Sequence, residues 1–231
     1  EIVSIKILKS RKKLTISLII MLLIVSVVQG KEKNNNTKAD STKKKSISLK
    51  KKTEKMDKFS GLFTFYQDTV NGSLYMEIHK NQINKEYIYF GHAHDGIVDV
   101  GFNRGSYRSS KIFSIQKYFN RIEFITENYG FYFDPDSPLS RASGANISKS
   151  IMSSNKIIAE DSLKNRVLIK ADDLFISEKL LQIKHYTPPN SRRFSLGKLN
   201  KEKSKYTDLR NYPKNSEIVV QFSYDNPTPK N

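Results

Sequence analysis

The chain has 231 residues and no cysteine, which excludes a disulfide framework, a cysteine zinc site and a thiol nucleophile. Its 13 phenylalanines and 12 tyrosines can build an apolar core, and its formal net charge is +17. Residues 1–58 hold 16 Lys/Arg and 5 Asp/Glu, whereas residues 59–231 hold 24 and 18. Most of the excess charge is therefore N-terminal and does not mark a folded basic face, so we expect no nucleic-acid partner.

Residues 1–30 have the pattern of a signal peptide. Five basic residues precede the apolar stretch LTISLIIMLLIVSVV at 14–28, and Val28-Gln29-Gly30 offers a cleavage site. The alternative is an uncleaved membrane anchor, although fifteen apolar residues are few for a helix that must span about 20. We expect an exported protein, in the periplasm, on the outer surface or secreted, which touches the membrane only through this segment if it stays uncleaved. The chain starts at Glu1 and not at methionine, which indicates a longer reading frame or an alternative start codon.

Residues 31–58 are polar, repetitive and rich in lysine. This composition predicts a disordered basic spacer, because so few apolar residues cannot bury enough surface to order the chain. The alternative is a polybasic segment that contacts anionic lipid.

Residues 59–105 are predicted to form a small β module. A strand at 61–66, the turn DTVNG at 68–72 and an alternating strand at 73–79 favour a hairpin. A third strand is expected at 87–90, and Val98, Val100 and Phe102 resume an alternating pattern after a glycine-hinged loop.

Residues 106–231 are predicted to form a second, β-rich α+β module that is truncated at its C-terminus. Strands are expected at 111–117, 121–127, 128–133, 156–160, 166–170 and 216–224, with a helix at 139–152 that Ser137 caps and a polar, lysine-rich excursion at 196–215. The predicted fold is therefore α+β and β-rich, with antiparallel hairpins or a meander and one or two short helices.

The loop after the 87–90 strand contains the one pattern that suggests a metal. His92 and His94 are two residues apart and Asp95 follows, so two imidazoles and a carboxylate could share an ion. Catalytic zinc needs three protein ligands, and no second histidine cluster exists, so we interpret this stretch as an ordinary polar loop. Arg104 lies in the turn Asn103-Arg104-Gly105. We interpret it as a salt-bridged turn residue in preference to a residue that contacts a ligand.

The remaining catalytic patterns are absent from the sequence. No G-x-S-x-G, H-E-x-x-H, G-x-G-x-x-G or G-x-x-x-x-G-K-[ST] run occurs. The pair Asp172-Asp173 could bind calcium or cap a helix, and capping is the better interpretation because the spaced oxygen ligands of a calcium loop are missing. No catalytic residue is predicted in this chain.

Four motifs resemble the N-terminal domains of unknown function of the large secreted bacterial zinc-dependent metalloproteases. They occur in the family's order and spacing from about residue 60, and they read GLFTFYQDTVNGSLYMEI with EYIYFG, VGFNRG at 100–105, VLIKADDLF at 167–175 and RNYPKNSE at 210–217. Asn103, Arg104 and Gly105 form the family-marker turn. Lys80 stands where the family's hairpin has proline, and His92 and His94 lie outside its pattern.

The resemblance implies that the chain is a fragment of an exported zinc metallopeptidase whose H-E-x-x-H domain is missing here. The predicted role is to help that domain fold, to cover its cleft or to bind peptide or protein substrate, and its partner is then its own C-terminal catalytic domain. Zinc is expected only in that domain, and no cofactor in this chain. The alternative is a free-standing surface or periplasmic module that binds polymer or protein through exposed aromatic side chains, with Tyr87, Tyr89, Tyr129 and Tyr132 as candidates.

Overall fold

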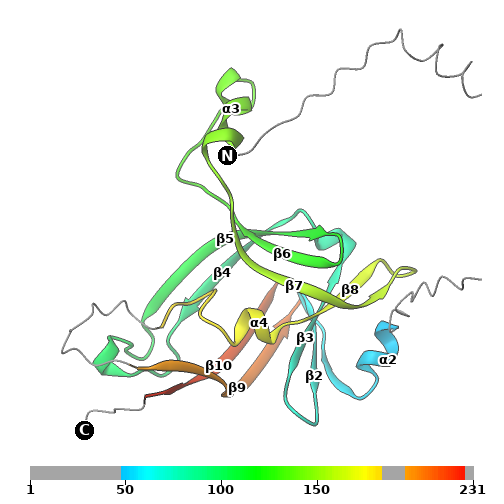
Figure 1. The fold of residues 1–231 in the computed structure, drawn as a ribbon, viewed down its shortest axis with the longest axis vertical. Helices are drawn as coiled ribbons and strands as arrows, with labels where there is room; N and C mark the ends of the chain where they lie inside the picture. Colours follow the sequence, from blue (N-terminus) through cyan, green and yellow to red (C-terminus); the bar gives the residue numbers. More distant parts are fainter. Residues whose placement is uncertain (1–47, 184–195, 227–231) are drawn as a thin grey trace, which may run out of the picture. The chain divides into compact units, whose positions relative to one another are not determined.

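The computed structural model describes residues 48–183 and 196–226 (Figure 1). These residues fold into strands joined by short helices, as follows: α2 (Leu49–Thr53), β1 (Met56–Phe59), β2 (Thr64–Asp68), β3 (Leu74–His79), η1 (Lys80–Gln82), β4 (Glu86–His92), η2 (Val98–Val100), β5 (Tyr107–Tyr118), β6 (Arg121–Thr126), α3 (Pro138–Asn146), β7 (Ser150–Asp161), β8 (Arg166–Lys170), α4 (Asp172–Phe175), β9 (Lys198–Tyr212) and β10 (Asn215–Asp225). All strand pairs are antiparallel. The predicted β-rich α+β fold is thus confirmed.

Eight strands form one sheet in the order β1-β2-β3-β8-β7-β6-β5-β4, and β9 and β10 form a separate hairpin. β3 and β4 follow one another in sequence, yet four strands lie between them in the sheet. A flat sheet would place them about 24 Å apart. The connection between them, residues 80–85, includes the short 3-10 helix η1 and can span only roughly 18 Å. The sheet must therefore curl until the end of β3 meets the start of β4.

The main core lies on the inner face of this curl. Alternate residues of β3 and β8, such as Met76 and Ile169, point to this face, as the period of a strand requires. The β9–β10 hairpin packs on the same core through Tyr206, Leu209 and Ile218. Fully buried members of the core include Phe65, Leu74, Met76, Ile78, Ile115, Ile122, Phe124 and Ile169.

Two side chains fasten the hairpin to the sheet. The Asn211 amide donates to the carbonyl oxygens of Phe59 (2.9 Å) and Phe63 (2.6 Å). Asp172 Oδ1 accepts from the Leu74 backbone N–H (2.8 Å) and from the Tyr206 hydroxyl (2.9 Å). Asp172 is therefore the first residue of α4 but not its cap, which corrects the capping interpretation. Its carboxylate instead joins β3, α4 and β9.

The predicted spacer is wrong for residues 48–58. This stretch forms α2 and β1, and Leu49 is only 1% exposed. Leu49 packs with Tyr66, Tyr75, Ala159 and Leu168 in a second apolar cluster on the outer face of the sheet. A few apolar residues within a basic stretch suffice here because the sheet already supplies the rest of the cluster. The remainder of the spacer and the signal segment at 1–30 lie outside the described residues.

Other local expectations also change. The excursion at 196–215 is mostly the long strand β9, which its polar composition concealed. The helix predicted at 139–152 ends at Asn146, and residues 150–152 belong instead to β7. Residues 128–133 are not a strand, and Val98–Val100 form η2 in place of an alternating strand. The Ser137 cap is confirmed by its 3.2 Å bond from the Leu139 N–H.

Within residues 48–183 and 196–226, no helix has the length and apolar character needed to cross a membrane.

Candidate functional site

The loop that contains the predicted histidine site is closed at its base by the backbone. The Ala93 N–H donates to the Ser106 carbonyl (2.9 Å), and the Gly105 N–H donates to the Ala93 carbonyl (2.7 Å). Residues 94–104 therefore leave and rejoin the β4–β5 ladder at one place.

The three metal candidates are exposed, and two of them, His94 and Asp95, contact each other. His94 Nδ1 lies 3.5 Å from Asp95 Oδ2, and Arg104 Nε lies 3.6 Å from Asp95 Oδ1. His92 ends β4 with an exposed side chain, opposite Tyr107 on β5. Among the described residues, no three His, Cys, Asp or Glu side chains are grouped so that they could hold a metal ion. The assignment of this stretch to an ordinary polar loop stays a prediction.

The family-marker turn has a structural role that its geometry explains. The Asn103 carbonyl accepts from the Ser106 N–H (3.0 Å), and Gly105 has a φ of +76°, a left-handed conformation in which a side chain is strained. The preceding Phe102 is buried beneath the Arg108 guanidinium, whose carbon lies 3.8 Å from the ring centroid. Arg104 itself is exposed and paired with Asp95, as predicted for a salt-bridged turn.

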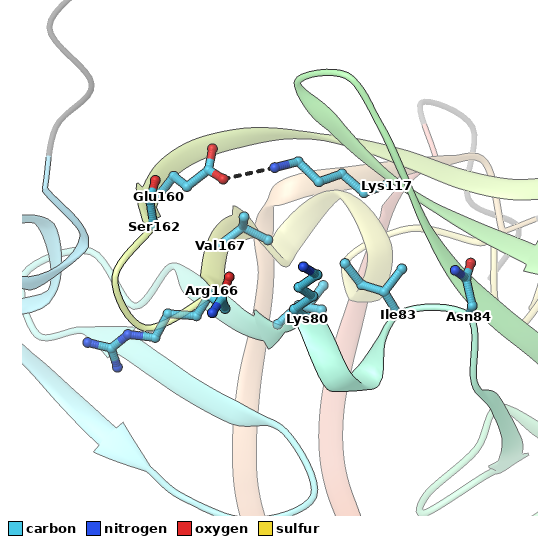
Figure 2. Close-up of a pocket in the computed structure, with 10 residues that line it drawn as sticks. Lys80, Ile83, Asn84, Lys117, Glu160, Ser162, Arg166 and Val167 are labelled. Carbon is cyan, nitrogen blue, oxygen red and sulfur yellow. Dashed lines mark hydrogen bonds and ion pairs between the residues drawn. The ribbon is translucent and has the colours of Figure 1, made fainter.

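A cleft of about 440 Å³ opens where the curl brings β3, η1, β5 and the β7–β8 turn together (Figure 2). Lys117 Nζ lies 2.9 Å from Glu160 Oε1, and Figure 2 shows the Arg166 guanidinium pointing away from Lys80. The lining residues are Ile78, Lys80, Ile83, Asn84, Lys117, Glu160, Ser162, Asn165, Arg166 and Val167.

The cleft carries no arrangement for acid–base or nucleophilic chemistry. Its lining has no histidine, and its one carboxylate, Glu160, is held in the ion pair with Lys117. A serine nucleophile needs a base within hydrogen-bond reach, and among the described residues no lining side chain is hydrogen-bonded to the Ser162 hydroxyl. Lys80 makes no ion pair among the described residues, so the cleft offers one uncommitted cation and two side-chain amides, those of Asn84 and Asn165.

Behind the cleft lies a buried carboxylate that the sequence did not reveal as special. Glu77, on the outer face of β3, is 2% exposed. It accepts from Arg166 Nη1 (3.2 and 3.1 Å) and from the Tyr66 hydroxyl (2.9 Å), and His79 Nε2 lies 2.9 Å from its Oε1. Arg166 also donates to Asp161 Oδ2 through Nε (3.2 Å) and Nη2 (3.0 Å). Every oxygen of Glu77 is thereby partnered, which assigns the network to structure and leaves no position for a substrate.

The network also perturbs its tyrosine. Burial, followed by the hydrogen bond to Glu77 and its charge, raises the pKa of Tyr66 to about 12. The Asp161 carboxyl has a lowered pKa because hydrogen bonds from Arg166 and Lys164 outweigh the effect of burial. At neutral pH these shifts keep Tyr66 protonated, so that it can donate to Glu77, and keep Asp161 ionised, so that it can accept from Arg166.

Three exposed aromatic residues lie close together in sequence in the connection between β6 and β7, residues 127–149, which we call the β6–β7 arm (Figure 1). Tyr129, Phe131 and Tyr132 are 53%, 62% and 86% exposed. The base of the arm is fixed by Glu127, which contacts Lys149 Nζ and the Ser114 hydroxyl, both at 2.7 Å. These two contacts outweigh burial and lower the Glu127 pKa.

The predicted set of exposed aromatics is thus half right. Tyr129 and Tyr132 are exposed, whereas Tyr87 and Tyr89 face inward on β4 and pack against the core. Burial raises the Tyr89 pKa to about 12. The outward-facing residues of β4 are instead Ile88 and Phe90, because the sheet curls so that the odd-numbered side chains of β4 face the core.

Sequence comparisons identify two domains of unknown function. The sequence model of DUF5117 matches residues 105–231, more than half of the chain, and that of DUF5118 matches residues 47–94. No curated protein and no solved structure matches the chain. The unmatched residues 95–104 lie in the loop between β4 and β5, and these two strands pair. One sheet therefore contains strands from both matched segments.

Proposed function

Because the chain belongs to the DUF5117 family, whose function is unknown, we propose from its own motifs that it is a non-catalytic binding region of an exported zinc-dependent metallopeptidase. In this proposal the catalytic domain lies beyond residue 231, and the curled sheet presents a contact surface to it or to its protein substrate. No cofactor is assigned to this chain. Zinc would belong to the catalytic domain.

The observation that carries the proposal is the order of the four motifs that resemble that peptidase family. Their residues occupy joints of the fold: the β2–β3 hairpin, the Asn103–Gly105 turn, the β8–α4 junction and the β9–β10 turn. These joints depend on local backbone geometry, so the resemblance of their residues supports a shared architecture.

The described residues support a binding role in place of catalysis. The cleft lacks a nucleophile with an adjacent base, and the Glu77 network is closed. The β6–β7 arm, in contrast, exposes three aromatic side chains on an anchored base. Aromatic residues are enriched where proteins bind proteins, because they bury a large apolar area at little conformational cost. We therefore assign contact with the peptidase domain or its substrate to the arm.

The deciding experiment extends the coding frame past residue 231. An H-E-x-x-H within a few hundred codons, together with zinc-dependent protein hydrolysis by the longer product but not by residues 1–231, is the expected result. A stop codon directly after residue 231, followed by an unrelated gene, would remove the peptidase proposal.

A second function, a free-standing module that binds surface polymer or protein, is favoured by the same exposed aromatics. It predicts that the full chain sediments with cell-wall glycan in high salt, where attachment through the basic N-terminal residues is screened. Tyr132→Ser would weaken this attachment, and Phe119→Ser, at an exposed residue of the β5–β6 turn, serves as the matched control. Equal sedimentation of both variants and the parent would exclude binding through the arm.

A further inference from the structure

The outward face of β4 has an order of side chains that suits pairing with itself. Glu86, Ile88, Phe90 and His92 point outward and are exposed, with Ile88 and Phe90 at 61% and 63%. In the described residues β4 pairs only with β5 and so forms one edge of the eight-stranded sheet. Its outer backbone groups therefore lack strand partners there.

The two central residues belong to a larger apolar patch. Ile112 on β5 lies opposite Ile88, and the Tyr107 ring lies 6.4 Å from that of Phe90. We call these four residues the β4 patch. Natural proteins protect edge strands with lysine, proline or a bulge. Residues 86–90 contain neither residue type, and the bulge comes only at Gly91/His92, where the strand ends.

We propose that a second copy of this chain pairs with it through β4, antiparallel and centred on Tyr89, so that two sheets join edge to edge. In this register Ile88 faces Phe90 of the other copy, and Glu86 faces His92 of the other copy, twice each by symmetry. An imidazole N–H then meets a carboxylate at both ends of an apolar centre. Parallel pairing would instead bring the two Glu86 carboxylates together.

The self-complementary order of charges selects a second copy as the occupant. A strand from a different protein could use the free edge, but nothing in β4 would favour it over an identical strand that matches acid to imidazole and apolar to apolar. A two-fold contact of this kind also closes on itself and does not propagate into a fibre. The two oxygens of the Glu86 carboxylate carry enough lone pairs to accept from His92 and from a neighbouring hydroxyl as well. The proposal is independent of the peptidase function.

The first test measures the mass of the full chain in solution by sedimentation equilibrium. We expect a concentration-dependent dimer, lost in Phe90→Lys, because two buried lysines would face apolar side chains across the axis. Val70→Lys, which replaces an exposed apolar side chain in the β2–β3 turn, should dimerise like the parent. A monomeric parent at its highest soluble concentration overturns the proposal, and so does association that survives Phe90→Lys, since it uses another surface.

The second test reads the register and uses the absence of cysteine in the chain. Residues directly opposite in an antiparallel pair have Cα atoms about 4.5–5.5 Å apart, which a disulfide can bridge. An oxidised mixture of Ile88→Cys and Phe90→Cys chains should therefore give the crosslinked heterodimer in excess over either variant alone. Equal crosslinking in all three samples overturns the proposed register. Protected β4 amides in a monomeric parent would assign the edge to another segment of the same chain and also overturn the proposal.

Discussion

β3 and β4 are neighbours in sequence and look alike, but the fold treats them differently. Both carry tyrosine and large apolar side chains, and both end in histidine. In β3 the outer face is buried as well as the inner face, with Tyr75 and Glu77 both nearly inaccessible, and only the final His79 is partly exposed. In β4 the outer face is open, and only the inner residues pack on the core.

The difference comes from what covers each strand. β3 lies inside the sheet between β2 and β8, and Leu49 of α2 joins the apolar cluster on its outer face. β4 lies at the edge, and its outward apolar residues are exposed. The alternation of side chains along a strand thus predicts which residues share a face. Whether that face is buried and stabilises the fold, or stays exposed, depends on the strand order and on the layer that covers it.

The largest effect is expected where β3 buries a charge. Arg166→Met removes the guanidinium from Glu77 and should lower the free energy of unfolding by about 4 kcal/mol, because a buried carboxylate loses its counter-charge. Arg104→Met breaks an exposed pair in the loop after β4 and should cost less than about 1 kcal/mol. Urea denaturation of both variants measures the contrast, and equal losses would contradict the division between covered and open regions.

The next effect tests whether α2 is a true covering layer of the sheet. Leu49→Ala removes a fully buried side chain and should cost about 3 kcal/mol in the same unfolding assay. Ile88→Ala, on the open face of β4, should change stability by less than about 0.5 kcal/mol at concentrations too low for self-association. If Leu49→Ala proves as harmless as Ile88→Ala, residues 48–53 do not stabilise β3, and the comparison fails.

Unfolding at alkaline pH should distinguish Tyr89, which faces the core from β4, from Tyr66, which lies on β2 beside β3. The folded-state pKa of Tyr89 is raised by burial from 10.0 to about 12, so between these values the unfolded chain loses a proton that the folded chain keeps. The contribution of Tyr89 to the free energy of unfolding is therefore fully present below pH 10. It is lost as the pH rises to 12, and the loss is about 2 kcal/mol. Tyr89→Phe should abolish this part of the loss, which unfolding curves at pH 8, 10 and 11.5 will measure.

Tyr66 provides the control for this titration. Its pKa is also raised to about 12, but its hydroxyl donates to Glu77. Tyr66→Phe should therefore lower stability by about 1 kcal/mol or more already at pH 8, because a buried acceptor loses a donor. If Tyr89→Phe shows the same loss at pH 8, the raised pKa of Tyr89 does not come from burial alone.

The elements that were predicted correctly are determined by residues within or next to the element itself. The strand at 74–79 alternates, Gly72 has the positive φ of +72° that the hairpin turn requires, and Ser137 precedes Pro138 at a helix start. The missed elements depend on distant residues. α2 is ordered by a sheet that follows it in sequence, and β9 is a strand because the core accepts Tyr206 and Leu209 from an otherwise polar run.

The candidate sites follow the same division. The turn at Asn103–Gly105 was predictable because three adjacent residues and one backbone bond make it. The cleft was not, since its lining comes from β3, η1, β5 and the β7–β8 turn, which only the curl of the sheet brings together. The partnership of Glu77 with Arg166 spans 89 residues, and neither residue stands out in its own strand.

The smallest effect compares the two histidines that end the strands. His79 contacts the buried Glu77 at 2.9 Å, so His79→Ala should lower the free energy of unfolding by about 1 kcal/mol, whereas His92→Ala should change it by less than about 0.5 kcal/mol. Unfolding at low protein concentration keeps β4 self-association out of the comparison. Added zinc should stabilise neither the parent nor His92→Ala, because among the described residues no three possible ligands, His92, His94 and Asp95 included, are grouped so that they could hold an ion. A zinc-dependent rise in the melting temperature that His92→Ala abolishes would reverse this assignment. The zinc-binding histidine would then be His92, which ends the exposed strand β4, and not His79, which ends the covered strand β3.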